Sequence, residues 1–180
     1  MTVFLAILGA LASAAGLYLF AEDMRSRRRF GWKQVTVLVR RMLDEMQSLN
    51  YKPDLVVGIG RGCAILAGML AGNLGHLPLV VLDTVIDHPT GIRRVEFRFP
   101  DCCPPLKDKR ILLVVGELYS GEDLRHAIEF AQLQQPAEIK AASLLTHPAA
   151  VVKPDFVGRE TGKPLSAPWR ITDAYKVSRI

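Results

Sequence analysis

The stretch KRILLVVGELYSGEDL, residues 109–124, decides the fold that we predict for this chain. An apolar run over residues 111–115 is typical of a buried strand, and an amphipathic stretch follows the polar loop after it. A strand that ends in a short loop at a helix N-terminus is a common way for an α/β protein to hold a phosphate. The loop also carries Glu117, Glu122 and Asp123, so negative charge lies where an anion is expected to bind.

Strand and helix patterns alternate along most of the remaining chain. We expect strands at residues 54–59, 79–85, 94–99, 111–115 and 139–145, and helices at 32–49, 63–73 and about 123–134. This alternation predicts an α/β fold with a parallel sheet flanked by helices. Prolines at 148, 154, 164 and 168 exclude long helices near the C-terminus. We therefore expect a small irregular hood over about residues 147–180.

The N-terminal segment is apolar. Residues 2–21 contain no charged side chain and are long enough to cross a bilayer core of about 30 Å as a helix. Basic residues follow this segment: Arg25, Arg27, Arg28, Arg29 and Lys33. The positive-inside rule then predicts a single-pass anchor in the inner (cytoplasmic) membrane, with the C-terminal domain in the cytoplasm. A cleaved signal peptide is the alternative, but such peptides carry positive charge before the apolar run.

The predicted division is a transmembrane anchor at 1–21, a basic juxtamembrane linker at 22–32 and one globular domain at 33–180. The net charge of +5 and the pI near 9.3 fit this division, because arginines beside anionic lipid gain about 1 kcal/mol each. The lipid bilayer is thus an expected partner. The other basic residues are scattered and lack interleaved aromatic residues, so nucleic-acid binding is not supported.

The cysteines suggest neither a disulfide framework nor a metal site. Cys102 and Cys103 are adjacent, Cys63 is distant, and the count is odd. Cysteine and histidine spacings typical of zinc ligands are lacking, and we assign no metal ligand.

Two glycine-containing loops follow expected strands. The first, residues 58–63, reads GIGRGC, and the second lies within residues 115–123. Because the carboxyl ends of parallel strands share one edge of a sheet, both loops are expected at the same edge. Glycine lets backbone N–H groups approach a ligand, and a helix N-terminus favours negative charge. Two anion sites on one edge suit a ligand with phosphates at both ends.

Residues 54–169 resemble the type I phosphoribosyltransferases, closest to the 6-oxopurine (xanthine–guanine) branch. PDLVVGIGRGCAILAGMLAGNLG, residues 53–75, looks like the pyrophosphate loop, usually Gly-x-x-Arg-Gly-Gly, with Cys63 in place of the last glycine. Residues 109–124 align with the signature for 5-phosphoribosyl-1-pyrophosphate (PRPP). The resemblance implies phosphate- and pyrophosphate-binding residues at Gly60, Arg61, Gly62, Cys63, Ser120 and Gly121.

The resemblance extends to the nucleobase. KPDFVG, residues 153–158, is similar to the hood segment of purine enzymes, which implies that Phe156 stacks on the base and Val157 contacts it through the backbone. APW, residues 167–169, resembles a further hood segment and adds Trp169. Ordinary packing under a loop is the alternative for each aromatic ring.

The sequence departs from the family at the sugar and at the base. The family's pair of adjacent acids, which holds the ribose hydroxyls, falls on Val115 and Gly116. Glu117 comes one position late, and strand alternation points it elsewhere unless the register slips. The aspartate that acts as base in purine enzymes is replaced by Tyr119, a poor base because its ordinary pKa is about 10.

The phosphate loop keeps Ser120 and Gly121 in place of the family's Thr-Gly pair, but Glu122 and Asp123 follow. A carboxylate within a few ångströms of a phosphate repels it by about 4 kcal/mol at an effective dielectric constant near 20. As first-turn residues of a helix, both acids are also favoured by the helix dipole.

Three functions stay open. The first is a membrane-anchored, catalytically degenerate phosphoribosyltransferase-like protein that binds a nucleotide-like ligand as a sensor, regulator or effector subunit. The second is an active purine phosphoribosyltransferase that uses PRPP and Mg²⁺, with Glu117 and Tyr119 as the candidate catalytic residues. The third is an interaction module with an empty cleft. Mg²⁺ is expected only with PRPP, and a homodimer and a partner protein are both left open.

Overall fold

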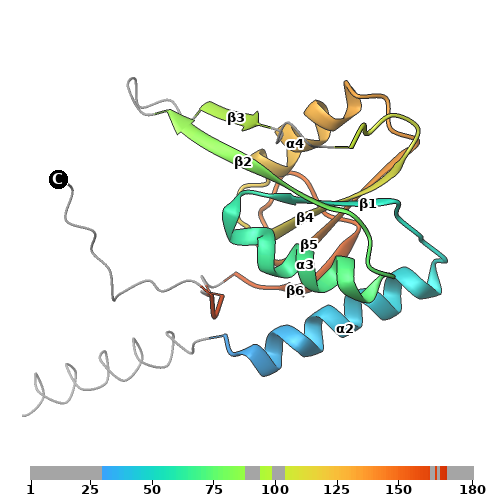
Figure 1. Cartoon of the computed structure of the whole chain (residues 1–180). Helices are drawn as coiled ribbons and strands as arrows, with labels where there is room; N and C mark the ends of the chain where they lie inside the picture. Colours follow the sequence, from blue (N-terminus) through green and yellow to red (C-terminus); the bar gives the residue numbers. More distant parts are fainter. Residues whose placement is uncertain (1–29, 88–93, 99–103, 163–164, 166, 170–180) are drawn as a thin grey trace, which may run out of the picture.

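A computed structural model describes residues 30–87, 94–98, 104–162, 165 and 167–169 (Figure 1). Its elements, in chain order, are α2 (Trp32–Ser48), β1 (Leu55–Ile59), a 3₁₀ turn (Arg61–Cys63), α3 (Ala64–Asn73), β2 (Leu79–Asp87), β3 (Arg94–Arg98), β4 (Arg110–Leu118), α4 (Glu122–Gln132), β5 (Glu138–Thr146) and β6 (Phe156–Glu160).

The strands form one sheet in the order β3-β2-β1-β4-β5-β6. Strand β3 is antiparallel to β2, and the other five strands are parallel to one another. The parallel sheet flanked by helices that the sequence predicts is thus confirmed. The carboxyl ends of β1, β4, β5 and β6 meet at one edge, where ligands bind in open α/β sheets.

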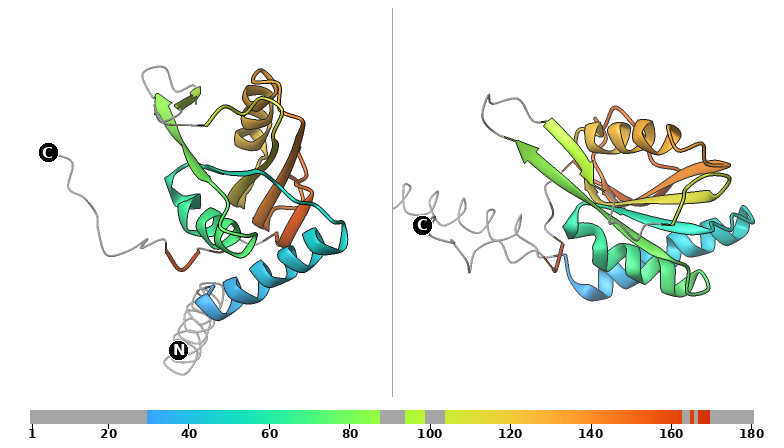
Figure 2. Two further views of the ribbon diagram at one scale, coloured as in Figure 1. Left: turned by 45° about the vertical axis from the view of Figure 1, so that its right-hand side comes forward. Right: turned by 45° about the horizontal axis from the view of Figure 1, so that its top comes forward.

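Helices cover both faces of this sheet. Figure 2 shows α2 and α3 on one side and α4 on the other. Alternate residues of β4 point to opposite cores: Leu112 and Val114 pack with α2 and α3, whereas Leu113 and Val115 pack with α4. Each such buried aliphatic side chain contributes roughly 1.5–3 kcal/mol relative to leaving it exposed.

Helix α2 forms where the apolar spacing predicts it. Its buried residues recur every three or four positions: Val35, Leu38, Val39, Met42 and Met46. At its start the side chain of Gln34 accepts a hydrogen bond from the backbone N–H of Gly31 (2.9 Å). The helix therefore presents one apolar stripe to the sheet and a polar face to solvent.

The irregular hood that we expected from residue 147 onward is wrong in part, because β6 is a regular strand of the sheet. It pairs in parallel with β5, from Ala142 opposite Phe156 to Thr146 opposite Glu160. A Cβ atom at Gly158 would lie 2.6 Å from the carbonyl oxygen of Leu144, so glycine lets the two strands approach. Prolines before a strand at the sheet edge disturb no ladder, and they exclude only helices here.

The predicted membrane anchor lies outside the described residues, as does most of the linker at 22–32. Within the part of the chain that the structure describes, no helix combines the length and the apolar character needed to cross a bilayer.

Candidate functional site

The two glycine loops meet at the carboxyl edge of the sheet. The first loop turns at Gly60, which has a φ of +76°, and leaves Arg61 and Gly62 exposed. Cys63 is buried, and its sulfur accepts a hydrogen bond from the backbone N–H of Gly116 (3.0 Å). This bond joins the first loop to the end of β4, so the predicted proximity of the two loops is observed.

The second loop is built around Ser120 and Gly121. The hydroxyl of Ser120 accepts a hydrogen bond from the backbone N–H of Glu122 (3.3 Å), and its carbonyl accepts one from Val151 (2.9 Å). Gly121 has a φ of +87°, and a Cβ atom there would lie 2.9 Å from the nitrogen of Val152. Both residues predicted to bind phosphate thus also fix the start of α4.

One acid of this loop, Glu122, is neutralised by an ion pair within α4. The carboxylate of Glu122 pairs with the guanidinium of Arg125 (2.6 Å), which also pairs with Glu129 (2.8 Å). The hydrogen bond from Arg125 lowers the pKa of Glu122. Because this carboxylate turns along the helix toward Arg125, it repels an anion at Ser120 less than the sequence alone suggests.

Val115 and Gly116, which stand at the positions of the family's acid pair, are both enclosed by other parts of the protein. Val115 is buried in the core beneath α4. Gly116 lies beside Cys63 and Trp169: a Cβ atom there would be 3.7 Å from the sulfur and 3.9 Å from the indole ring. The described structure thus places no carboxylate where the family's acids are expected.

The register shift that would turn the Glu117 side chain toward the position of the acid pair is not observed. The β4–β5 register is the same from Arg110 opposite Glu138 to Leu118 opposite Thr146. Instead, the segment after β6 reaches the Glu117 carboxylate. One of its oxygens accepts a hydrogen bond from the backbone N–H of Ala167 (3.1 Å).

The two predicted catalytic residues lie together. The hydroxyl of Tyr119 donates to the other carboxylate oxygen of Glu117 at 3.4 Å, a long hydrogen bond. Beside them is a cavity of about 10 Å³, lined also by Thr146, His147 and Thr161. The Thr146 hydroxyl is buried and has no hydrogen-bond partner among the described residues.

Sequence reasoning missed Thr146 and His147. The signal available was their position at the carboxyl end of a predicted strand, next to the strand that carries the phosphate loop.

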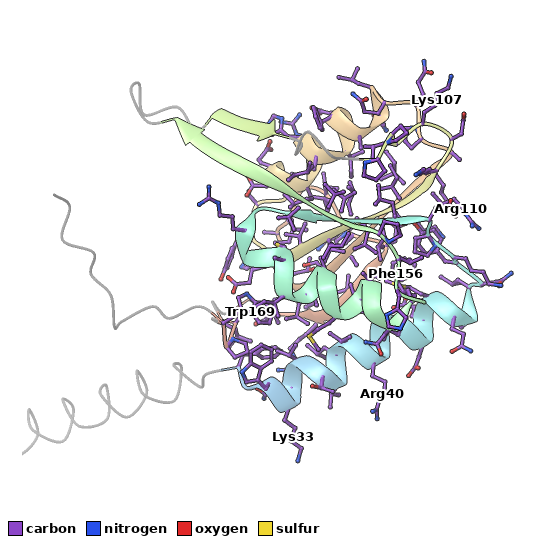
Figure 3. The ribbon with its side chains drawn as sticks, in the orientation of Figure 1. Lys33, Arg40, Lys107, Arg110, Phe156 and Trp169 are labelled. Carbon is purple, nitrogen blue, oxygen red and sulfur yellow. The ribbon has the colours of Figure 1, made fainter. Side chains whose placement is uncertain are left out.

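Of the predicted nucleobase contacts, only Trp169 lies at this site. Its ring stands beside Gly116 and 5.8 Å from the ring of Trp32, the first residue of α2. Figure 3 shows Trp169 near the start of α2 and well apart from Phe156.

The stacking role expected for Phe156 does not fit its position. Its ring has no exposed surface and packs 5.6 Å from the ring of Tyr51, in the core beneath α2. Alternation along β6 turns this side chain inward, so the similarity of the hood segment is misleading here. Val157, its neighbour, pairs with Ser143 in the sheet and lines an open groove on the outer side of β6.

Tyr51 itself shows how tightly this core is built. Its hydroxyl donates to the carbonyl of Ile111 (2.9 Å), and burial raises its pKa above the ordinary value. The residue supports the beginning of β4, at the end of the sheet opposite the two glycine loops.

Mg²⁺ finds little support in the protein groups. Among the described residues, no three acidic, histidine or cysteine side chains gather into a cation site. The carboxylate nearest to the phosphate loop on β4, that of Glu117, already accepts two hydrogen bonds. Mg²⁺ that accompanied PRPP would therefore be held mainly by oxygens of the ligand itself.

Comparison with protein-family models gives one match, to the phosphoribosyl transferase domain, over residues 31–175. The chain belongs to this family. The match includes both glycine loops, the described sheet and the segment that carries Trp169. A search of curated proteins found no match.

Solved structures agree with this phosphoribosyltransferase fold. A purine phosphoribosyltransferase from Pyrococcus horikoshii is similar at 29% identity and a TM-score of 0.71, over 81% of this chain and 95% of its own. The xanthine-guanine-hypoxanthine phosphoribosyltransferase of Helicobacter pylori shares 18% identity, with a TM-score of 0.69 over 79% and 93% of the two chains. A hypothetical protein from Neisseria gonorrhoeae with bound ppGpp shares 19%, with a TM-score of 0.64 over 81% and 89%. At such low identity the last two support the fold alone.

Proposed function

We propose that this phosphoribosyltransferase-family domain binds a nucleotide or related phosphorylated ligand at the carboxyl edge of β1 and β4, without efficient turnover of PRPP. The observation that carries this proposal is the environment of Gly116. Its N–H bonds to Cys63 and its α-carbon faces Trp169, where the family's ribose-binding acids are expected.

The phosphate-binding half of the site is better preserved than the sugar-binding half. Arg61 and Gly62 are exposed on the first loop, and Ser120 is exposed at the start of α4. A helix N-terminus attracts an anion through its dipole and its free N–H groups. The guanidinium of Arg61 adds charge, and the pairing of Glu122 with Arg125 removes part of the opposing charge.

We further propose that residues 1–21 hold the domain at the cytoplasmic membrane as a single-pass anchor. The uncharged apolar segment and the arginines after it support this placement. Ligand binding at a membrane-attached domain then suits a sensor, regulator or effector subunit. A homodimer or a separate partner protein would carry the signal onward.

A ligand with phosphate groups at two places fits the two loops best. One solved structure of this fold contains bound ppGpp, a guanosine nucleotide with two separate diphosphates. This supports including ppGpp, with PRPP and simple purine nucleotides, among the first ligands to test.

The second candidate is an active purine phosphoribosyltransferase. A specific observation favours it: Glu117 and Tyr119 lie together at the carboxyl edge, joined by a contact of 3.4 Å. In that case the Glu117 carboxylate would release the N–H of Ala167 to hold a ribose hydroxyl. Arg61 would then stabilise the departing pyrophosphate.

One experiment separates these functions. Thermal unfolding of the full chain in nanodiscs is recorded with ppGpp, with GMP, and with PRPP and Mg²⁺, and pyrophosphate release is then measured after a purine is added. A ligand at 100 times its Kd adds about 2.7 kcal/mol to the stability of the folded state. We expect a higher Tm with a nucleotide and no purine-dependent release. Release that is abolished by Glu117→Gln and kept in Glu138→Gln, a control at the other end of the sheet, would establish the enzyme instead. No shift with any ligand would contradict both.

A further inference from the structure

The exposed face of α2 changes its charge along the helix. Lys33, Val37, Arg40 and Arg41 share one exposed face through their spacing, and the first acidic residue of the helix is Asp44. Figure 3 shows the side chains of Lys33 and Arg40 pointing away from the sheet. Within the described residues, no ion pair engages the three basic side chains. The first half of α2 is therefore a cationic surface.

The edge of the sheet extends this cationic surface. An open groove of about 590 Å³ lies between α2 and β6, lined by Arg41, Lys153 and Arg159. Its one carboxylate, that of Glu160, is paired with Lys153 (3.1 Å). The guanidinium of Arg159 also lies 5.8 Å from the centre of the Phe30 ring, just before α2. The α2–β6 surface, defined by Lys33, Arg40, Arg41, Lys153 and Arg159, thus has five basic residues and one acid, a net charge of about +4 because Lys153 and Glu160 form an ion pair.

Apolar side chains stand among these cations. Trp32 is 51% exposed and Val37 is 60% exposed. Both lie outside the buried apolar stripe of α2. Tryptophan is enriched at the level of lipid headgroups, and a helix with basic and apolar residues on its outer face suits a membrane surface. A surface for a soluble anion needs no exposed Trp and Val.

The chain also places this face near a bilayer. Ten residues separate Ala21, at the end of the predicted anchor, from Trp32, and they span at most about 35 Å. Four of these residues are arginines. The acidic positions Asp44 and Glu45 lie about 18 Å farther along the helix, at 1.5 Å per residue. The charge of α2 therefore becomes basic toward the predicted anchor.

We propose that the α2–β6 surface docks the folded domain on the anionic lipid headgroups of the membrane that holds its N-terminus. This inference rests on the membrane attachment in the proposed function. Each basic residue near anionic lipid contributes about 1 kcal/mol, so the four that form no ion pair within the described residues would together orient a tethered domain.

The start of α2 is connected to the candidate site by the contact between Trp32 and Trp169. Trp32 adjoins Lys33 at the start of α2, and its ring is 5.8 Å from that of Trp169, which stands beside Gly116. Two residues before Trp169, Ala167 donates to Glu117. The short segment from Ala167 to Trp169 thus links Trp32, at the start of α2, to Glu117 and Gly116 at the candidate site.

Lysine acetylation tests this inference on the unaltered full chain. The chain is placed in nanodiscs of phosphatidylcholine, with or without phosphatidylglycerol, and the acetylation rate of each lysine is read by mass spectrometry. We expect Lys33 and Lys153 to react several-fold more slowly on the anionic discs. Lys52 and Lys107, exposed and outside the α2–β6 surface, serve as internal references and should keep their rates.

Charge variants then separate docking from attachment. Arg40→Gln should raise the acetylation rates of Lys33 and Lys153 on the anionic discs, whereas Lys52→Gln, which removes the same charge elsewhere and leaves Lys107 as the reference, should not. A chain that stays with the discs but shows equal rates on both lipids overturns docking alone. A chain that does not stay with either disc overturns the attachment and the docking together.

Discussion

Gly121 meets two separate demands at the start of α4. Its φ of +87° favours glycine, and the backbone nitrogen of Val152 would lie 2.9 Å from a Cβ atom. We expect Gly121→Ala to lower the free energy of unfolding by more than the roughly 1–2 kcal/mol that left-handed backbone alone costs. Gly75→Ala is the matched control, because Gly75 has a φ of +103° and open space around it. Urea unfolding measures both variants, and equal losses would contradict the steric part.

Asp54 makes stability depend on pH. Arg110 donates to its carboxylate from the side chain (2.9 Å) and from the backbone (2.9 Å), which lowers the pKa of Asp54 from 3.8 to about 2. A lowered folded-state pKa contributes stability above pH 3.8, and this stability is lost as the pH falls toward 2. Both side chains are more than 40% exposed, so the expected contribution is at most about 1 kcal/mol.

Unfolding of Asp54→Asn at several pH values tests this prediction. The variant should be less stable than the parent at pH 7, and the difference should shrink between pH 4 and 2. Glu138→Gln, at the same end of the sheet, is the control. A difference that is unchanged at low pH would mean that the loss comes from packing.

Strand β6 depends on a close approach to β5. We expect Gly158→Ala to cost about 1–3 kcal/mol, because a Cβ atom would lie 2.6 Å from the Leu144 carbonyl oxygen and force the strands apart. Gly162→Ala, with nothing within 4 Å, should change the stability little. Chemical unfolding compares the two, and a neutral Gly158→Ala would contradict the observed spacing.

The segment after β6 is held to β4 by Glu117. Ala167 is 2% exposed and its N–H donates to the Glu117 carboxylate (3.1 Å). Glu117→Ala leaves this buried donor without its acceptor, which costs about 1–3 kcal/mol, whereas Glu117→Gln keeps an amide oxygen in place. We expect the first variant to unfold at clearly lower urea concentration and the second to stay near the parent. Similar losses in both would show that the bond does not hold the segment.

Elements with a clear period could be predicted, and the exceptions have a physical reason. The spacing of Val35, Leu38 and Met42 identified α2 because one stripe faces the sheet. Strand β6 is absent from the prediction because the prolines around it favour irregular structure, although Pro148 and Pro154 only precede this edge strand. Phe156 was misjudged because a motif alone cannot distinguish a ring that stacks on a ligand from one that fills a core.

At the scale of the molecule, the site brings together segments that no local pattern connects. The sulfur of Cys63 and the N–H of Gly116 are 53 positions apart, and the Trp169 ring joins them from the end of the described chain. The departure from the family's acid pair was readable from the sequence. Cys63 and Trp169 lie where the acid pair is expected, and their positions depend on how β1, β4 and the final segment pack together. No local sequence pattern predicts that packing.

The position of Arg61 on the first glycine loop predicts that it contributes to ligand binding. Arg61 is exposed on the loop that the bond between Cys63 and Gly116 joins to β4. Arg61→Gln should change the stability of the free chain little, because Arg61 is exposed, but weaken binding of a phosphorylated ligand. A tenfold weaker Kd removes about 1.4 kcal/mol of the stabilisation at a fixed ligand concentration, which is visible as a smaller rise in Tm.

Lys107→Gln is the control, since it removes one exposed cation at the far end of the sheet (Figure 3). Thermal unfolding of the full chain and both variants, with and without ppGpp, gives three ligand-induced shifts in Tm to compare. If Arg61→Gln and Lys107→Gln reduce the rise in Tm equally, ligand binding depends only on the net charge of the protein, which contradicts a specific role of Arg61. A rise that only Arg61→Gln reduces places the phosphate at the first glycine loop, and the paired Glu122 then explains why the acidic second loop tolerates it.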